Sequence, residues 1–155
     1  MSGMTDGRSR RIADDIHLIF MGRAIERYYG PDALEALLAW KHRKIRETWR
    51  RRAAESGRSD AAYLECLFSP DAHEFEVIES SPTRLEVTVR DCVHARTFRS
   101  YGAADLGERL ICAGDHAVVE GFNPQMRLDR ASTCMTGDCC PFVFTVTPGS
   151  PRPRR

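Results

Sequence analysis

The chain is 155 residues long, with 42% hydrophobic residues, 29% charged residues and a formal net charge of +1. This length and composition predict one globular domain, and the near-neutral charge argues against nucleic acid or a membrane surface as the main partner. No apolar run approaches the ~20 residues of a transmembrane helix, and the N-terminal residues form no apolar signal-peptide region. We therefore expect a cytoplasmic protein, in which thiols stay reduced and a disulfide framework is disfavoured.

Apolar residues recur at helical spacing through the first half of the chain, at Ile12, Ile16, Ile19, Leu34, Leu37, Leu38 and Trp49. The Gly30–Pro31 pair predicts the end of one helix and the start of the next, and Gly57 predicts the end of the second helix. Ser59 is expected to cap a short third helix that runs to Leu67. Residues 1–9 precede the first apolar stripe, and we expect them to be disordered.

The second half of the chain changes to the alternating pattern of strands. The segment RLEVTVR has one apolar face, made by Leu85, Val87 and Val89. The preceding HEFEVIES can pair with it, and QMRLDRAST with CPFVFTV predicts a second hairpin around Gly137-Asp138, with a helical segment between the hairpins. This order predicts an α+β domain over residues 10–147, with N-terminal helices packed on an antiparallel sheet of four or more strands. The Pro- and Arg-rich tail, residues 148–155, is expected to be disordered.

Thiol and acid–base residues gather at the ends of these elements. Cys92 and His94 follow the second strand, and Cys112 and Asp115 are three apart on a helix, so they share a face. A thiolate needs an adjacent base or positive field to exist at neutral pH. His94 can be that base and Asp115 can orient it or protonate a leaving group, in which case Cys92 should react well below the ~8.5 pKa of a free thiol. The alternative is a buried thiol at a strand end beside a solvated histidine.

Two further positions bear on a pocket. Cys140 shares a strand face with Phe142, which favours a core thiol, whereas the functional alternative is a thiol that faces the site. A Gly-Asp turn separates Thr133 from Cys140, so the hairpin is expected to deliver both to a pocket whose wall includes Cys112. Asn123 lies where the helix and the hairpin should converge, so it and Thr133 are candidates for substrate hydrogen bonds, although both residue types are more often caps or surface groups.

A metal site is the next alternative. The residues that are zinc ligands by type are Cys92, His94, Cys112, Asp115, His116, Cys139 and Cys140. No C-x-x-C pair exists among them, and their spacing differs from that of a zinc knuckle. We therefore expect no metal. If one binds, the ligands would be Cys92, Cys112 and Cys140.

An ordered series of motifs runs from RDCVHA to CCPF. It consists of a cysteine after a strand, a C-x-x-D helix, an asparagine-proline, an arginine-rich strand, a threonine, and a Gly-Asp turn leading to Cys-x-Phe. The positions are Cys92, Cys112 with Asp115, Asn123-Pro124, Arg127 and Arg130, Thr133, Gly137-Asp138, and Cys140 with Phe142. This series resembles the L-2-amino-thiazoline-4-carboxylic acid hydrolase family. The resemblance covers the C-terminal part of the chain, and the N-terminal helices carry no signature of the family.

The resemblance implies hydrolytic opening of a cyclic amidine, thiazoline or lactam-like ring at a C–N or C–S bond. In such a reaction Cys92 would be the nucleophile and Asp115 the acid/base, and Arg127 or Arg130 would hold the substrate carboxylate. No cofactor is implied, and the expected partner is a small-molecule substrate, with a homo-oligomer left open. Attack by water in a cysteine-lined pocket is an alternative mechanism. A non-catalytic module that binds a small molecule is an alternative function.

Overall fold

Two long helices form the N-terminal half of the domain in the computed structural model, which describes residues 3–147. Helix α1 (Gly3–Tyr29) and helix α2 (Pro31–Ser56) meet at Gly30, whose φ of 86° is accessible to glycine without steric cost. Helix α2 ends at Gly57, which adopts the left-handed conformation that favours glycine. Both helix boundaries confirm the predictions made from the glycines.

Helix α1 includes residues 3–9, which belong to the N-terminal segment that we expected to be disordered. The helix has a tertiary partner there. A Cβ at Gly7 would lie 2.9 Å from the Asp71 carboxylate, so the two segments touch. One turn later, the Arg11 guanidinium donates a hydrogen bond to the Ser69 hydroxyl at 3.4 Å. This end of α1 therefore contacts the turn before the first strand, which the sequence pattern did not predict.

A short 3-10 helix, η1 (Ala61–Leu67), follows α2, as expected. Its cap is Asp60 and not Ser59, because the Asp60 carboxylate accepts a 3.2 Å hydrogen bond from the Tyr63 N–H. Serine and aspartate are about equally good caps, so the sequence does not separate two adjacent candidates.

The second half of the chain forms one antiparallel sheet, as predicted. Its strands are β1 (His73–Ser80), β2 (Arg84–Cys92), β3 (Met126–Asp129) and β4 (Cys140–Val146), in the spatial order β1-β2-β4-β3. The two predicted hairpins are β1–β2 and β3–β4, and pairing of β2 with β4 joins them. The tail that we expected to be disordered, residues 148–155, lies outside the described residues.

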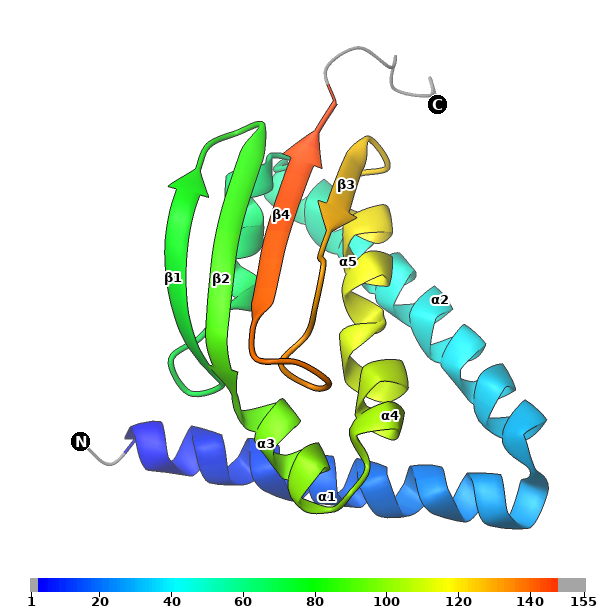
Figure 1. The fold of residues 1–155 in the computed structure, drawn as a ribbon. Helices are drawn as coiled ribbons and strands as arrows, with labels where there is room; N and C mark the ends of the chain where they lie inside the picture. Colours follow the sequence, from blue (N-terminus) through cyan, green and yellow to red (C-terminus); the bar gives the residue numbers. More distant parts are fainter. Residues whose placement is uncertain (1–2, 148–155) are drawn as a thin grey trace.

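The segment between the hairpins is helical, as expected. It consists of α3 (Val93–Ser100), α4 (Ala104–Gly107), a π-helical turn η2 (Glu108–Cys112) and α5 (Gly114–Phe122). Helix α2 packs on α5 behind the sheet, and α1 crosses the end of the sheet at which β2 runs into α3 (Figure 1). None of the described helices is long and apolar enough to cross a membrane.

The core lies between the sheet and the helices. On β2 the inward residues are Leu85, Val87 and Val89, each at most 1% exposed. Phe144 pairs with Leu85 and Phe142 with Val87 across the β2–β4 ladder, so aromatic and aliphatic side chains face each other on one side of the sheet. The two-residue periodicity in the sequence therefore identified the buried face correctly.

Helices α2 and α5 approach closely at Gly121. A Cβ there would lie 2.5 Å from the Arg46 carbonyl oxygen and 2.7 Å from the Arg46 Cα. Because backbone atoms cannot move aside as a flexible side chain does, Gly121→Ala should lower the free energy of unfolding by about 1–3 kcal/mol, measured by urea denaturation. In the control Gly114→Ala the added methyl meets only the Ile45 side chain, at 3.4 Å, so its effect should stay under about 1 kcal/mol. Equal losses in the two variants would contradict this reading of the interface.

Candidate active site

Most of the predicted site residues line one cavity of about 200 Å³, where strands β2 and β4 meet helices α1, α3 and α5. From the predicted set it contains Cys92, His94, Cys112, Asp115, Arg130 and Cys140. Arg11 and His73, which the sequence did not single out, also line it, and the apolar wall comes from Leu67, Phe68, Val89, Ile111 and Phe142. A small apolar hollow with a few convergent polar groups is typical of a ligand-binding site.

Cys92 reaches the cavity because the β1–β2 pairing is irregular. His73 and Phe75 are two residues apart on β1, whereas their partners on β2, Cys92 and Val89, are three residues apart. The extra residue on β2 makes a β-bulge and reverses the alternation of side chains. Cys92 therefore lies on the same face as Val89, whose partner on β4 is Cys140, and the two thiols open into one cavity.

Cys92 is a neutral thiol at pH 7. Burial raises its pKa to about 11, although the backbone N–H groups of His94 and Ala95 at the start of α3 act in the opposite direction. The side chain makes no capping hydrogen bond to that helix. This is the reverse of the lowered pKa expected for an activated thiol, so Cys92 can act as a nucleophile only if a base removes its proton.

His94, on the same cavity wall, is oriented by a buried carboxylate. Its Nδ1 lies 2.8 Å from both carboxylate oxygens of Asp15, whose side chain is 2% exposed. Because an ionised carboxylate only accepts hydrogen bonds, we assign the donated proton to Nδ1, which leaves Nε2 as the basic nitrogen of the neutral ring. An imidazole held in this way is the arrangement that activates a nucleophile in many hydrolytic enzymes.

Asp15 was missed by the sequence analysis, although a signal for it exists. It lies four residues before Ile19, which is fully buried, so the two share the face of α1 that packs against the rest of the domain. A carboxylate at such a position needs a partner, because burial of an unpaired charge is costly. The partner is on α3, and the local sequence contains nothing that would identify it.

Asp115 of α5 is held by Arg130, which follows β3. One terminal nitrogen of the guanidinium donates to the Asp115 carboxylate at 2.5 Å and the other to the Cys112 carbonyl at 3.0 Å. The guanidinium also lies 5.2 Å from the centre of the Phe142 ring. Burial raises the pKa of Asp115 and the charge of Arg130 opposes that rise. A carboxyl group with a raised pKa suits a residue that delivers a proton, and Arg130 is the residue that positions it.

The other two thiols of the cavity are also neutral. Burial raises the pKa of Cys112, and it raises the pKa of Cys140 to about 12. The Cys140 sulfur accepts a 2.8 Å hydrogen bond from the Cys134 N–H, which fixes its position in the wall. Among the residues that the structure describes, no group of three or more Cys, His, Asp and Glu side chains could hold a metal ion.

Three residues predicted to bind substrate lie outside this cavity. Arg127 is exposed, because the parity of β3 turns it away from the core. Thr133 is buried, and its hydroxyl donates to the Glu108 carboxylate. The Asn123 side chain donates to the Ser59 carbonyl at 2.7 Å. Strand parity therefore explains why Arg127 is exposed. Internal hydrogen bonds explain where Thr133 and Asn123 lie, although the sequence pattern alone had placed both near a ligand.

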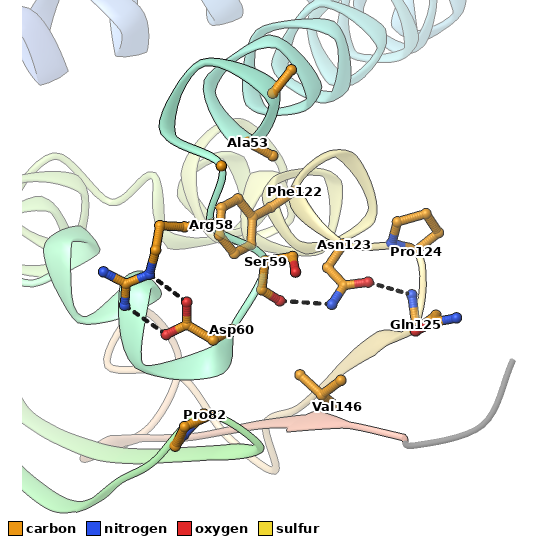
Figure 2. A pocket seen from close by; sticks show the side chains of 12 residues that line it. Ala53, Arg58, Ser59, Asp60, Pro82, Phe122, Asn123, Pro124, Gln125 and Val146 are labelled. Atoms are coloured by element: carbon orange, nitrogen blue, oxygen red, sulfur yellow. Dashed lines mark hydrogen bonds and ion pairs between the residues drawn. The ribbon is translucent and has the colours of Figure 1, made fainter. Parts of the chain in front are cut away.

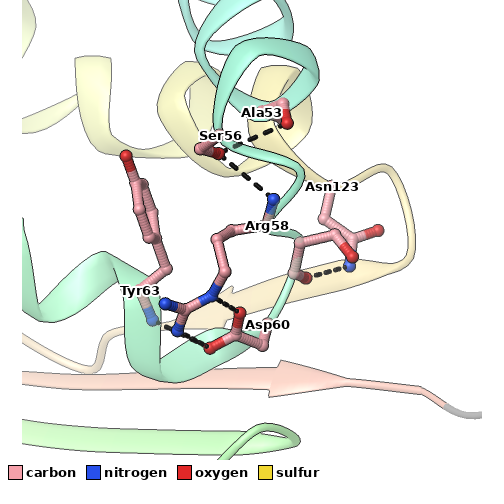
Figure 3. A network of polar contacts seen from close by, with 7 residues as sticks. Ala53, Ser56, Arg58, Asp60, Tyr63 and Asn123 are labelled. Carbon is pink, nitrogen blue, oxygen red and sulfur yellow. Dashed lines mark hydrogen bonds and ion pairs between the residues drawn. The ribbon is translucent and has the colours of Figure 1, made fainter.

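Asn123 lines a larger hollow of about 620 Å³, bounded by the end of α2, the start of η1 and the α5–β3 turn (Figure 2). Its Oδ1 accepts a 2.9 Å hydrogen bond from the Gln125 N–H. The charged groups there, Arg58 and Asp60, pair with each other at 2.5 and 2.7 Å in a network that ties α2 to η1 (Figure 3). No Cys or His is among the described residues that line it, so the smaller cavity is the better candidate for chemistry despite its size.

The raised pKa of Cys92 can be tested by alkylation. Because only the thiolate reacts, the rate at Cys92 should rise about tenfold per pH unit up to about pH 11. Peptide mapping by mass spectrometry with iodoacetamide gives this rate for each cysteine separately. A free thiol in solution is the reference, since its rate levels off near pH ~8.5. A plateau at Cys92 below pH 8 would show a preformed thiolate and contradict the effect of burial.

Comparison with known proteins adds a family to this geometry. A model of the L-2-amino-thiazoline-4-carboxylic acid hydrolase family matches residues 17–144, which include every cavity residue except Arg11. No curated protein and no solved structure matches the chain. The family match covers most of the sequence, with strands β1 to β3 complete and β4 as far as Phe144. The chain belongs to the L-2-amino-thiazoline-4-carboxylic acid hydrolase family.

Proposed function

We propose that this protein is a cysteine-dependent hydrolase that opens a small cyclic amidine, thiazoline or lactam-like ring at a C–S or C–N bond. The family name indicates a hydrolase that acts on a thiazoline carboxylic acid. The observation that supports the cysteine mechanism is the lining of one cavity. It includes the Cys92 thiol, the His94 imidazole, which is hydrogen-bonded to Asp15, and the Asp115 carboxyl. These groups supply a nucleophile, a base and an acid.

For an amino-thiazoline substrate, the first half of the reaction opens the ring. His94 Nε2 takes the proton of Cys92, and the sulfur bonds to the ring carbon between nitrogen and sulfur. The C=N electrons move to the ring nitrogen, which takes a proton from Asp115. The C–S bond of the ring then breaks, the departing sulfur takes the proton from His94, and an amidinium remains on Cys92 next to the Asp115 carboxylate.

The second half releases the enzyme. Water adds to the amidinium carbon and gives a proton to His94. The bond from carbon to Cys92 breaks, Cys92 recovers a proton from His94, and the hydroxyl proton of the adduct returns to Asp115. The net change is addition of one water and formation of a urea and a free thiol. In this cycle Asp15 is a positioning residue, because it bonds to His94 and does not line the cavity.

A second mechanism has support from one observation. The pKa of Cys92 is raised to about 11, which favours a base that acts on water directly while the thiols shape the cavity. The same His94 and Asp115 would serve that route, in which water attacks the ring carbon and Asp115 protonates the ring nitrogen. The two mechanisms differ in their dependence on the Cys92 sulfur, so substitution of that atom decides between them.

The nucleophile is tested by hydrolysis of 2-amino-thiazoline-4-carboxylate, followed by the appearance of free thiol. Cys92→Ser and Asp115→Asn should each lower kcat by at least about 100-fold, because a nucleophile or a general acid is lost. Cys66→Ser is the matched control, since Cys66 is an exposed thiol, and it should keep full activity. Full activity of Cys92→Ser would replace the covalent mechanism by direct attack of water, and no hydrolysis by the natural chain would remove the proposed function.

The role of Asp15 is tested by Asp15→Asn, which keeps the size of the side chain. Its amide can bond to the other tautomer of His94, so the imidazole no longer presents a basic Nε2. We expect kcat to fall on the order of 100-fold or more while KM changes little, since Asp15 does not line the cavity. Circular dichroism checks that the variant is folded. A rise in KM at constant kcat would show that Asp15 acts on binding and not on the base.

A further inference from the structure

Arg11 brings a positive charge to the cavity from a helix that the sequence analysis did not connect with the site. It lies on α1 and lines the cavity together with His73 and His94. Its guanidinium makes one weak hydrogen bond, to the Ser69 hydroxyl at 3.4 Å. Within residues 3–147 no carboxylate forms an ion pair with it. Most of its five N–H donors are therefore available to a ligand.

The two carboxylates nearest the cavity already have bonding partners. Asp15 is bonded to His94, and Asp115 is paired with Arg130. In the part of the chain that the structure describes, neither carboxylate forms an ion pair with Arg11. An anionic ligand would supply a partner for Arg11, and in a site screened from water that attraction is stronger than at a free surface.

His73 adds a second group without a partner. Its Nδ1 is buried and has no hydrogen bond in the part of the chain that the structure describes. The residue faces Cys92 across the β1–β2 ladder, and its ring centre is 6.4 Å from that of His94. Burial lowers its pKa to about 4, with the charge of Arg11 and that of a protonated His94 acting in the same direction. The ring is thus neutral at pH 7, and a bound molecule can satisfy its orphan nitrogen.

The two arginines predicted from the sequence are not available to bind a substrate carboxylate in the cavity. Arg127 is exposed on β3, and both terminal nitrogens of Arg130 are engaged with Asp115 and the Cys112 carbonyl. Arg11 also precedes residues 17–144, so the family match contributes nothing to its assignment. The guanidinium with free donors is the planar fork that binds a carboxylate through two parallel hydrogen bonds.

We propose that Arg11 binds the carboxylate of the substrate and that His73 Nδ1 bonds to a polar atom of the same molecule, so that this side of the cavity selects small ring compounds with an acidic substituent. The proposal rests on the proposed function, since it names the recognition half of the same site. With the carboxylate on Arg11, the ring would lie among the Cys92, His94 and Asp115 side chains that line the rest of the cavity.

Direct binding tests this without relying on turnover. The probe is thiazolidine-4-carboxylate, whose saturated ring has no amidine carbon to hydrolyse, and isothermal calorimetry gives its Kd. Arg11→Gln should raise Kd about 10- to 100-fold, the range for loss of a charge-assisted hydrogen bond. Arg11→Lys keeps the positive charge but loses the planar guanidinium, so its Kd should lie between that of the natural chain and that of Arg11→Gln. His73→Phe keeps the ring shape without the nitrogen and should weaken binding by about tenfold.

Arg10→Gln is the matched control, because Arg10 is the neighbouring arginine on α1 and its side chain is 76% exposed. It should bind the probe as the natural chain does. The carboxamide of the same ring supplies the second comparison, since removal of the negative charge should weaken binding to the natural chain and leave binding to Arg11→Gln unchanged. Unchanged carboxylate binding by a folded Arg11→Gln variant, or failure of the natural chain to bind the probe, would overturn the proposal.

The hydrolysis experiment and the carboxylate-binding experiment can give independent outcomes. If the natural chain binds the carboxylate through Arg11 but hydrolyses no ring, the proposed function is lost and the recognition site stands. If the chain hydrolyses 2-amino-thiazoline-4-carboxylate and Arg11→Gln leaves KM unchanged, the function stands and the role of Arg11 is overturned. The result that we expect is a 10- to 100-fold rise in KM, about as large as the rise in Kd, at nearly constant kcat.

Discussion

The need to pair a buried charge determines how the pieces of this domain meet. Asp15 is almost completely buried on α1, and its bond to His94 joins that helix to the end of β2 and the start of α3. Asp115 on α5 and Arg130 after β3 form the second such pair. Removal of one partner would leave a buried charge without compensation, so each pair ties together the two elements that carry it. The cavity lies between these two pairs.

The strand irregularity before α3 has a comparable effect on the thiols. Because β2 contains one residue more than β1 between two paired positions, Cys92 turns inward and meets Cys140 and His73 on the buried face. The same burial that gathers the thiols keeps them protonated, since an apolar environment disfavours the thiolate. A thiol in this environment therefore needs a base in order to react, and in the proposed mechanism that base is His94, which Asp15 holds in place.

The cavity has two sides with different tasks. One side carries His94 and Asp115, to which we assign proton transfer, and both side chains bond to neighbours in the protein. The other carries Arg11 and His73, whose bonding capacity is not satisfied by the protein. Unsatisfied polar groups are costly in a folded chain, so their persistence in a cavity is a reason to look for a ligand that completes them. The larger hollow near Asn123 lacks this property, because its polar groups bond to one another.

The sequence alone determined the order and type of the elements, because Gly30, Gly57 and the two-residue alternation of β2 and β4 act locally. It also named Cys92, Asp115 and Arg130 as candidates, because their motif series is local to the C-terminal half, and the three line one cavity. Three things were decided only by tertiary structure. The bulge that turns Cys92 inward depends on which residues of β1 pair with β2. Strand parity exposes Arg127 and Asp115 engages Arg130, so neither arginine predicted to hold the substrate carboxylate is available for it. Asp15 and Arg11 reach the site only because α1 crosses the end of the sheet and brings together side chains 79 positions apart in the chain. No local pattern encodes such a contact, since it arises when separate elements bury their charges against each other.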